Sequence, residues 1–539
     1  GDKLIILSEN RPEWVITDLA NLCLRGVTVP IYTSLVPEQI KYIIDNSDAR
    51  IVVCSNEELW QKINSIRGEL TKVDHYIILD TEADEGVLTF SQVTEKGRKV
   101  DEDQPGLFQK EALAVAPDDV ASIIYTSGTT GIPKGVMLTH GNFISNVKSC
   151  SEIIPFSDKD TVLSFLPLSH VLERMVTFTY LYKGCSIGYA ESIESVAENL
   201  LEIRPHIMVS VPRVFEKIYS KVMDNVLQSS PLKRKIFFWS VKVGREFGRR
   251  KLQKQPIPGW LQFKKNLAHK LVFSKIIEKT GGRVRFFVSG GAPLSKDIAE
   301  FFYAMGLIVL EGYGLTETSP VISVNTLDRI KFGTVGRPIP GVEVKIAEDG
   351  EILTRGPHVM RGYYKMEAET QEAFEGGWFH TGDIGYLDED GFLVITDRKK
   401  DIIVTAGGKN VAPQPIENSL KTNPYISNVV VIGDRRKFIS ALVVPDFEKL
   451  EDYARFNKIP YESMSDLVKN EKVINFMMSE VDRSTPLLSS YEKIKKIALL
   501  DRDFELEKGE ITPTLKVRRN IVQKKYADLI ESLYREDVD

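Results

Sequence analysis

Short runs of apolar, β-branched residues alternate with stretches of helical periodicity along most of the chain. Such runs occupy residues 4–7, 51–53, 76–79, 207–211 and 286–288. Strands that alternate with helices in this way predict an α/β fold with layered, mostly parallel sheets. No apolar run reaches the roughly 18 residues that a membrane span requires, so the pattern predicts no transmembrane helix.

The pattern changes near Phe332, where glycine-rich turns and short strands such as residues 342–346 and 351–353 begin. A chain of 539 residues exceeds the roughly 250–300 residues at which single cores stop growing. We therefore predict a large multi-layer N-terminal domain over residues 1–397, with a β-rich subdomain at 331–397. A small α+β C-terminal domain over 398–539 should contain a hairpin formed by 429–432 and 439–444.

A loop rich in glycine and hydroxyl residues, 125–135 (YTSGTTGIPKG), follows the apolar segment 120–124. Glycine lets backbone N–H groups approach a ligand closely, and consecutive N–H and hydroxyl groups form a nest for phosphate. The loop is not a Walker A motif, because proline precedes its lysine and glycine follows it. A glycine-rich surface turn is the alternative. The candidate nucleotide ligands are Thr126, Ser127, Gly128, Thr129, Thr130, Gly131 and Lys134.

Four further motifs follow in order: 312–320 (GYGLTETSP), 378–385 (WFHTGDIG), 397–401 (DRKKD) and 512–516 (TPTLK). Together with the loop they cover nearly the whole chain. They resemble the signatures of the adenylate-forming superfamily, which includes acyl-CoA synthetases, peptide-synthetase adenylation domains and beetle luciferases. Long-chain fatty acid:CoA ligases are the most similar members. The resemblance implies ATP, Mg²⁺ and CoA as co-substrates and metal, and acyl-AMP as the intermediate between a fatty acid and its CoA thioester.

The resemblance also implies roles for the nucleotide site. Glu317 would be the magnesium ligand, a role that suits a carboxylate. Thr316 would contact the α-phosphate, and Tyr313 with Gly314 would face the adenine. Asp383 would bind the ribose and Arg398 the ribose or a phosphate, while Gly291, Ala292 and Pro293 would wall the adenine.

The small C-terminal domain is mobile in this superfamily. The resemblance makes Lys516 the adenylation lysine, although Thr514-Leu515 replace the usual Ser-Gly and both Arg518 and Arg519 compete for the role. Lys400 falls at the hinge. Gly407 and Gly408 would line the CoA pantetheine tunnel after the domain rotates for the second step.

Two residues have structural alternatives. His170, in 166–170 (LPLSH), resembles a residue that gates the acyl pocket or orients the carboxylate, but a structural histidine is an equal interpretation. Phe215, in 211–215 (VPRVF), resembles the acyl gate of long-chain members, although a phenylalanine there is usually a core residue.

Residues 232–275 combine thirteen lysines and arginines with seven aromatic side chains and a single acid, Glu246. Basic helices with exposed aromatics are typical of an anchor on an anionic membrane surface. The alternative is a solvated basic face whose aromatics belong to the core. The net charge of −5 and the lack of a recognisable nucleic-acid module argue against nucleic acid binding.

Four scattered cysteines are typical of a reducing compartment, and we expect a cytoplasmic protein that contacts the membrane peripherally. Related chains usually carry more sequence ahead of the first strand, and the first residues predict a strand, not a signal peptide. Two functional alternatives stay open: a fatty acyl-AMP ligase that loads an acyl carrier protein, and a catalytically silent membrane adaptor.

Overall fold

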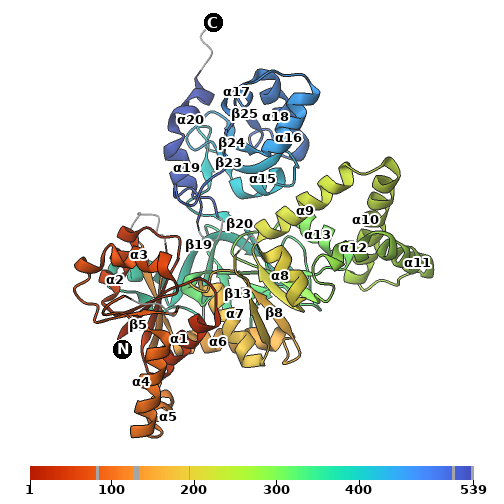
Figure 1. The fold of residues 1–539 in the computed structure, drawn as a ribbon. Coiled ribbons are helices and arrows are strands. Elements are labelled where there is room, and N and C mark those ends of the chain that lie inside the picture. The colour runs from red at the N-terminus through yellow and green to blue at the C-terminus, as the bar shows by residue number, and fades with distance from the viewer. Residues whose placement is uncertain (81–83, 127–132, 193–194, 513–515, 536–539) are drawn as a thin grey trace.

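The computed structural model describes residues 1–80, 84–126, 133–192, 195–512 and 516–535. A smaller C-terminal domain sits on a large N-terminal body (Figure 1). The body contains two large sheets and a β-rich region, and it carries two helical projections. The α/β class predicted from the apolar pattern is confirmed.

The first sheet has eight strands in the order β17-β7-β6-β2-β1-β3-β4-β5. The strands from β6 to β5 run parallel, whereas β7 is antiparallel to both β6 and β17. All five residues of β2 are buried, as expected for a parallel sheet that is covered on both faces. The bounds are β1 Lys3–Leu7, β2 Val27–Ile31, β3 Ala49–Cys54, β4 His75–Ile78, β5 Leu88–Thr89, β6 Val120–Thr126, β7 Lys134–Thr139 and β17 Gly362–Tyr363.

The second sheet has seven strands in the order β14-β13-β12-β11-β10-β8-β9. Its strands from β12 to β9 run parallel, and β13 and β14 add an antiparallel edge. The predicted strands at 207–211 and 286–288 are the neighbours β10 and β11. The bounds are β8 Thr161–Ser164, β9 Ser186–Tyr189, β10 Ile207–Ser210, β11 Phe286–Ser289, β12 Val309–Gly314, β13 Val321–Val324 and β14 Arg337–Pro338.

Helices α6 (His140–Ile153) and α7 (Val171–Lys183) share one core with strands of both sheets. A capping box starts α6, because the Thr139 hydroxyl accepts from the Asn142 N–H and the Asn142 side chain accepts from the Thr139 N–H. On α7 the buried Arg174 lies 2.6 Å from Asp18 of α1. Losing either partner would leave an uncompensated buried charge, so this pair holds α7 firmly against α1.

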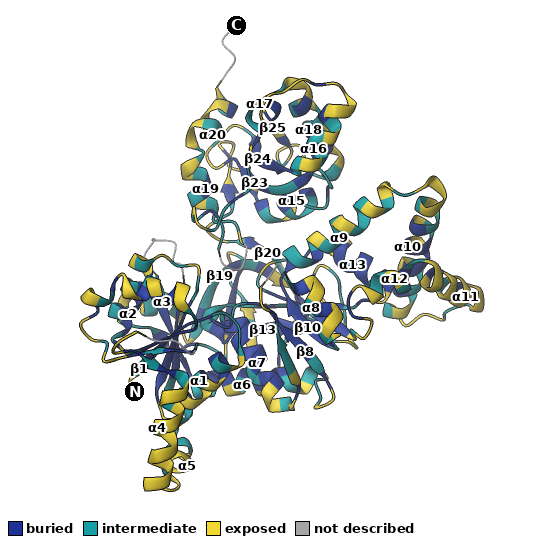
Figure 2. Cartoon of the chain, viewed as in Figure 1, coloured by how far each residue is buried: buried dark blue, intermediate teal, exposed yellow. Residues whose placement is uncertain are grey.

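Other helices of the N-terminal body cover the outer faces of the sheets or project from them. Figure 2 shows that α4 and α5 form a projection whose surface is largely exposed. The bounds are α1 Pro12–Cys23, α2 Pro37–Ser47, α3 Glu57–Asn64, α4 Phe90–Asp103, α5 Leu107–Leu113 and α8 Val196–Ile203.

The β-rich region expected after Phe332 is an antiparallel sheet in the order β15-β16-β19-β18, with β20 paired to β19. Its bounds are β15 Glu343–Ile346, β16 Glu351–Arg355, β18 Phe374–Glu375, β19 Trp378–Leu387 and β20 Leu393–Arg398, with helix α14 at Glu367–Glu372. The pairing of β19 with β20 sets Asp383 opposite Arg398. The exact domain boundaries remain predictions.

The C-terminal domain has its own core around a three-stranded sheet. The expected hairpin is present as β23 and β24, and β25 runs parallel to β24. The bounds are β21 Ile403–Val404, β22 Asn410–Val411, β23 Ile426–Ile432, β24 Ile439–Pro445, β25 Ile494–Leu499, α15 Pro413–Leu420, α16 Phe447–Phe456, α17 Met464–Leu467, α18 Glu471–Ser484, α19 Arg519–Lys525 and α20 Ala527–Tyr534.

The basic segment forms a helical projection whose main break falls at Pro256 and Pro258, as expected. Its aromatic side chains divide: Phe237 and Phe273 belong to the core, while Trp260 and Phe263 are exposed. Among the described residues, no helix has the length and apolar character needed to cross a bilayer. The bounds are α9 Pro212–Leu227, α10 Pro231–Leu252, α11 Gly259–Ala268, a π-helical turn His269–Phe273, α12 Ser274–Glu278 and α13 Lys296–Met305.

Candidate active site

Strand ends of both sheets open into one cavity of about 800 Å³. β6 ends at Thr126, β11 at Ser289 and β12 at Gly314, and all three residues line the cavity. In open α/β sheets, ligands bind in crevices outside the carboxyl ends of the strands. The C-terminal domain lies over these strand ends (Figure 1), and its Leu506 and Lys516 supply part of the opposite side.

Three predicted nucleotide residues form one unit, joined by a hydrogen bond and an ion pair, which we call the fixed wall: Tyr313, Asp383 and Arg398. The Tyr313 hydroxyl donates to Asp383 Oδ2 at 2.6 Å, and Arg398 Nε lies 3.2 Å from Asp383 Oδ1. Burial and the Asp383 charge raise the pKa of Tyr313, which keeps its hydroxyl protonated as the donor. Tyr313 and Arg398 line the cavity, whereas Asp383 is buried directly behind them.

Thr316 and Glu317 lie on the short turn Thr316–Thr318 after β12, and both line the cavity. The Tyr363 hydroxyl donates to Glu317 Oε1 at 3.0 Å. Lys134 Nζ lies 4.9 Å from the centre of the Tyr363 ring. Tyr363 therefore joins two residues that the motifs predicted separately. Tyr363 stands outside every motif, so the sequence does not predict it, and only the pairing of β17 with β7 brings it here.

Glu317 can serve as a magnesium ligand with help from the substrate. Among the described residues, no group of three or more His, Cys, Asp or Glu could hold a metal ion by itself. Mg²⁺ in phosphate-transfer sites usually takes one or two carboxylates and completes its shell with phosphate and water. Glu317, a carboxylate that lines the same cavity as Lys134, fits that donor set.

Lys516 lies on the opposite side of the cavity, on a loop that closes on itself. Thr512 N–H donates to the Lys516 carbonyl at 2.8 Å, and Lys516 N–H donates to the Thr512 hydroxyl at 3.0 Å. Desolvation by the surrounding protein, with a smaller contribution from the Arg398 charge, lowers the pKa of Lys516 to about 8. Lys516 is thus a cation near the fixed wall, and it loses its proton more readily than an ordinary lysine.

The two arginines that compete with Lys516 for the adenylation role, Arg518 and Arg519, lie in different surroundings. Arg518 lines the cavity beside Lys516. Arg519 donates to Glu417 Oε1 and to the Val431 carbonyl, each at 2.7 Å, within the C-terminal domain. Arg519 is therefore a structural residue of that domain.

His170 has a structural role and also lines the cavity, while its role toward the acyl group stays a prediction. It caps α7, since its Nδ1 accepts from the Leu172 N–H at 3.2 Å, and it also lines the cavity. Burial, with a smaller effect of the Lys516 charge, lowers the pKa of His170 to about 4. The ring is therefore neutral at pH 7, with its proton on Nε2.

A further part of the cavity is apolar, and we call it the apolar arm: Cys150, Ile154, Phe156, Met175, Val176 and Thr179. On α7, the lining residues 171, 172, 175, 176 and 179 recur at helical spacing on one face. The Phe156 ring packs edge-on against Tyr180, with ring centres 5.7 Å apart. Burial raises the pKa of the Cys150 thiol to about 12, so it acts as an inert apolar group.

Several predicted residues lie away from the cavity. Ala292 and Pro293 do not line it, although the neighbouring Gly291 does. Phe215 is buried in the core, where its ring centre lies 5.6 Å from Phe287 and 5.7 Å from Phe302. A gate there would require Phe215 to leave well-packed aromatic neighbours.

Of the residues predicted for the second step, one lines the cavity and two do not. Lys400 lines the cavity, whereas Gly407 and Gly408 occupy an exposed turn between β21 and β22. Their roles remain predictions, because they concern another orientation of the domain. Ser127, Gly128, Thr129, Thr130 and Gly131 lie outside the described residues.

Comparison with known proteins agrees with this geometry. Residues 1–364 match the AMP-binding enzyme family, and residues 400–538 match the AMP-binding enzyme C-terminal domain. The first match covers more than half of the chain, so the chain belongs to the AMP-binding enzyme family.

Full-length relatives narrow the comparison. The chain is 37% identical over 541 residues to long-chain-fatty-acid–CoA ligase FadD15 of Mycobacterium bovis, covering 100% of this chain and 88% of that protein. It is 35% identical to the peroxisomal long chain acyl-CoA synthetase 7 of Arabidopsis thaliana, covering 99% and 78%. A long-chain-fatty-acid–CoA ligase of Xenopus laevis, ACSBG2, is 34% identical, with coverage of 98% and 76%.

Solved structures share the fold at lower identity. The chain is 23% identical to ATP-bound MatB from Rhodopseudomonas palustris, with a TM-score of 0.67 and coverage of 98% and 89%. It is 19% identical to the anthranilate CoA ligase AuaEII in complex with anthranoyl-AMP, with a TM-score of 0.71 and coverage of 99% and 89%.

Proposed function

We propose that the chain is a long-chain fatty acid:CoA ligase that uses ATP with Mg²⁺. In the first step, a carboxylate oxygen of the fatty acid attacks the α-phosphorus of ATP, and pyrophosphate leaves to give acyl-AMP. In the second step, the thiol of CoA attacks the acyl carbonyl and AMP leaves. One observation carries the proposal: a single cavity joins an apolar arm, the fixed wall and a lysine from a second domain.

The residues divide the work of the first step. Attack at the α-phosphorus builds negative charge, which a preorganised cation stabilises most when water is excluded. Lys516 and Arg398 supply positive charge from the two sides of the cavity. We assign the ribose to Asp383, the α-phosphate to Thr316 and a magnesium ion to Glu317.

The apolar arm supports a fatty acid as the acyl donor. Small-ligand sites are mostly apolar, with a few placed polar groups that set orientation. The neutral His170 stands in the same cavity and carries its proton on Nε2, so it can donate a hydrogen bond to a carboxylate. Relatives that align over nearly the entire chain are named long-chain ligases, which favours a long acyl chain.

CoA is the acceptor that these relatives favour, since their names specify CoA. We assign Lys400 to the hinge and Gly407 and Gly408 to the pantetheine tunnel after rotation. Glycine at such positions lets a ligand approach the backbone closely. A carrier protein as acceptor is the competing proposal.

A two-stage assay tests the function. With palmitate, ATP and Mg²⁺, we expect pyrophosphate release and bound acyl-AMP; added CoA should give palmitoyl-CoA and AMP. Acyl-AMP that accumulates with CoA but transfers to an acyl carrier protein would favour the carrier-protein alternative. No palmitate-dependent pyrophosphate release would refute the ligase proposal and favour a silent adaptor.

We further propose that the helical projection contacts an anionic membrane, on its cytoplasmic face, where long-chain fatty acids partition. Its exposed apolar residues stand among lysines and arginines; they are Leu232, Phe238, Trp260, Phe263, Leu267 and Leu271. Lys264 Nζ lies 4.8 Å from the centre of the Trp260 ring. Amphipathic basic helices bind by inserting such side chains and by attraction to anionic lipids.

Point variants test this contact better than removal of the segment, because Phe237 and Phe273 belong to the core. We expect Trp260→Ser with Phe263→Ser to weaken binding to phosphatidylserine-containing vesicles by at least about tenfold, from the area each ring buries. Salt should weaken wild-type binding as well. Phe456→Ser is the control, since that exposed ring lies on the C-terminal domain. Equal vesicle binding by all variants would contradict the proposal.

A further inference from the structure

Helix α9 reaches the C-terminal domain at two places. Arg213 Nη1 donates to the Ser427 carbonyl at 2.8 Å, and Lys449 Nζ lies 2.7 Å from Asp224 Oδ1. Lys449 Nζ also donates to the Ser220 hydroxyl at 3.4 Å. Arg213, Ser220 and Asp224 follow one another at spacings of seven and four, so they share a face of α9. At 1.5 Å per residue, the two contacts lie about 16 Å apart along the helix.

The Arg213 contact connects with the loop that carries Lys516. Ser427 is the second residue of β23, and its hydroxyl donates to Asp503 Oδ2 at 3.2 Å. Arg502 donates to the Asp503 carbonyl at 2.9 Å and also holds Glu510, at 2.6 and 2.7 Å. Glu510 is completely buried and precedes the Lys516 loop, whose far end returns to it through the Arg518 N–H.

The Lys449 contact joins two partly buried side chains. Lys449 stands on α16 and is 19% exposed, while Asp224 is 30% exposed. Lys449 also donates to the Pro424 carbonyl at 2.9 Å, which fixes its side chain within its own domain. A charge pair that is held in place and partly shielded from water contributes more than a freely exposed one.

We propose that Arg213 and Lys449 are positioning residues for the first step of the proposed reaction. They hold the C-terminal domain in the orientation that brings Lys516 into the cavity. Two contacts about 16 Å apart resist rotation of the domain far better than one contact would. Both must separate before the domain can turn about Lys400 for the second step.

This role predicts unequal effects on the two half-reactions. Ion pairs of this exposure shift an equilibrium by roughly two- to fivefold each. Charge reversal adds repulsion, so Lys449→Glu should lower acyl-AMP formation by about five- to tenfold. Thioester formation from supplied acyl-AMP and CoA should stay unchanged or rise, because the competing orientation becomes easier to reach.

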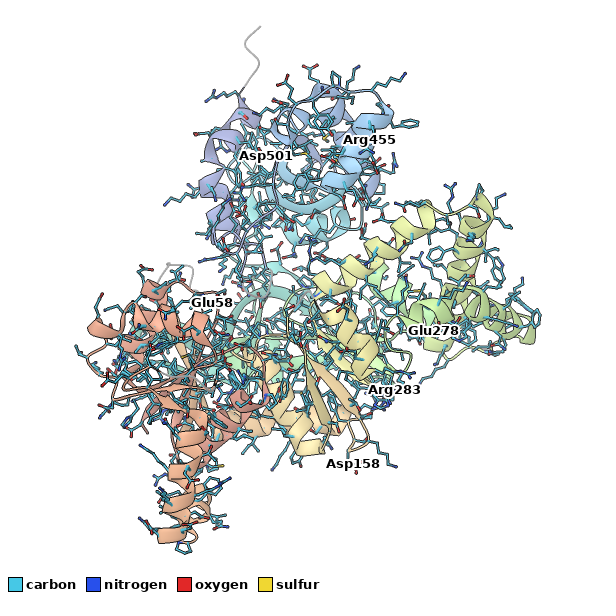
Figure 3. The ribbon with its side chains drawn as sticks, viewed as in Figure 1. Glu58, Asp158, Glu278, Arg283, Arg455 and Asp501 are labelled. Carbon is cyan, nitrogen blue, oxygen red and sulfur yellow. The ribbon has the colours of Figure 1, made fainter. Side chains whose placement is uncertain are left out.

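The test compares Lys449→Glu with the exchanged pair Lys449→Glu/Asp224→Lys in the full chain. The exchanged pair should recover most of the lost acyl-AMP formation. Arg455→Glu is the matched control, because Arg455 also belongs to α16 but pairs with Asp452 of the same helix. Figure 3 shows Arg455 in the upper part of the C-terminal domain, away from the N-terminal body. If charge reversal lowers the melting temperature, Lys449→Met and Arg213→Met replace Lys449→Glu in the test. We expect both variants to lose less acyl-AMP formation than Lys449→Glu.

Equal loss of both half-reactions, or no recovery in the exchanged pair, would overturn the proposal. Amide hydrogen exchange gives a readout that needs no substrate: Lys449→Glu should speed exchange at the start of β23 and leave the first sheet unchanged. Unaltered exchange there would equally count against the contact. If wild-type protein forms no acyl-AMP, the proposed function fails, but this exchange experiment still judges the contact separately.

Discussion

The two sides of the cavity are built in different ways. On one side, Tyr313, Asp383 and Arg398 form a fixed wall in which strand pairing, a buried hydrogen bond and an ion pair set each position. On the other side, Lys516 belongs to the smaller C-terminal domain and lines the cavity from there. A nucleotide must stay bound through both steps, so its ligands gain from rigidity. A charge that is needed in only one step is best carried by a domain that can rotate away, as proposed for the domain of Lys516.

The largest expected effect separates the two sides. Lys516→Ala should slow acyl-AMP formation by roughly 10²–10³-fold, the usual cost of losing one stabilising group for developing charge. Conversion of supplied acyl-AMP to the thioester should stay nearly unchanged. Half-reaction rates with and without CoA measure this difference. Lys524→Ala, an exposed lysine of α19, is the control. Equal loss in both halves would show that Lys516 does not act in one step alone.

A change in the fixed wall should have a smaller effect than Lys516→Ala, and it should slow both steps. Asp383→Ala removes charge-assisted hydrogen bonds that are each worth about 1.5–3 kcal/mol, so the KM for ATP should rise roughly 10- to 100-fold. Because AMP remains bound during the second step, acyl-AMP use should weaken as well. Initial rates at varied ATP and acyl-AMP test this. An unchanged KM for ATP would remove Asp383 from the nucleotide site.

The smallest effect concerns pH. Because the pKa of Lys516 is lowered to about 8, the ammonium form is lost as pH rises through about 8. The kcat/KM for acyl-AMP formation should therefore fall above that pH, since this ratio reports the free enzyme. Arg398→Ala removes a neighbouring positive charge, raises the pKa of Lys516 and moves the falling limb to higher pH. If the fall in kcat/KM stays at the same pH in Arg398→Ala, a group other than Lys516 causes it.

Much of the fold could be predicted from local pattern. The apolar runs at 4–7, 51–53 and 207–211 are the strands β1, β3 and β10, and Pro256 with Pro258 break the basic helices. These features depend on neighbours within a few residues. The motif residues Tyr313, Glu317, Arg398 and Lys516 do reach one cavity, although nearly 200 residues separate Glu317 from Lys516.

Other features depended on contacts that local pattern does not encode. Asp383 is expected at the ribose, and that role stays a prediction; what local pattern could not give is its depth beside Tyr313 and Arg398, because strand pairing and burial set it. Phe215 belongs to an aromatic cluster with Phe287 and Phe302, which come from elements far along the chain. The sequence does not predict the apolar arm, because the apolar residues of α6 and α7 have the spacing of ordinary core helices.

By itself, the sequence determined the α/β class, the order of the elements and the residue types that a nucleotide and an acid require, since these follow from local periodicity and from motifs a few residues long. Tertiary structure alone decided which side chains share the cavity, how deeply Asp383 is buried, and which contacts hold Lys516 in place. Burial, hydrogen-bond partners and pKa are properties of the packed environment, and that environment is assembled from segments hundreds of residues apart.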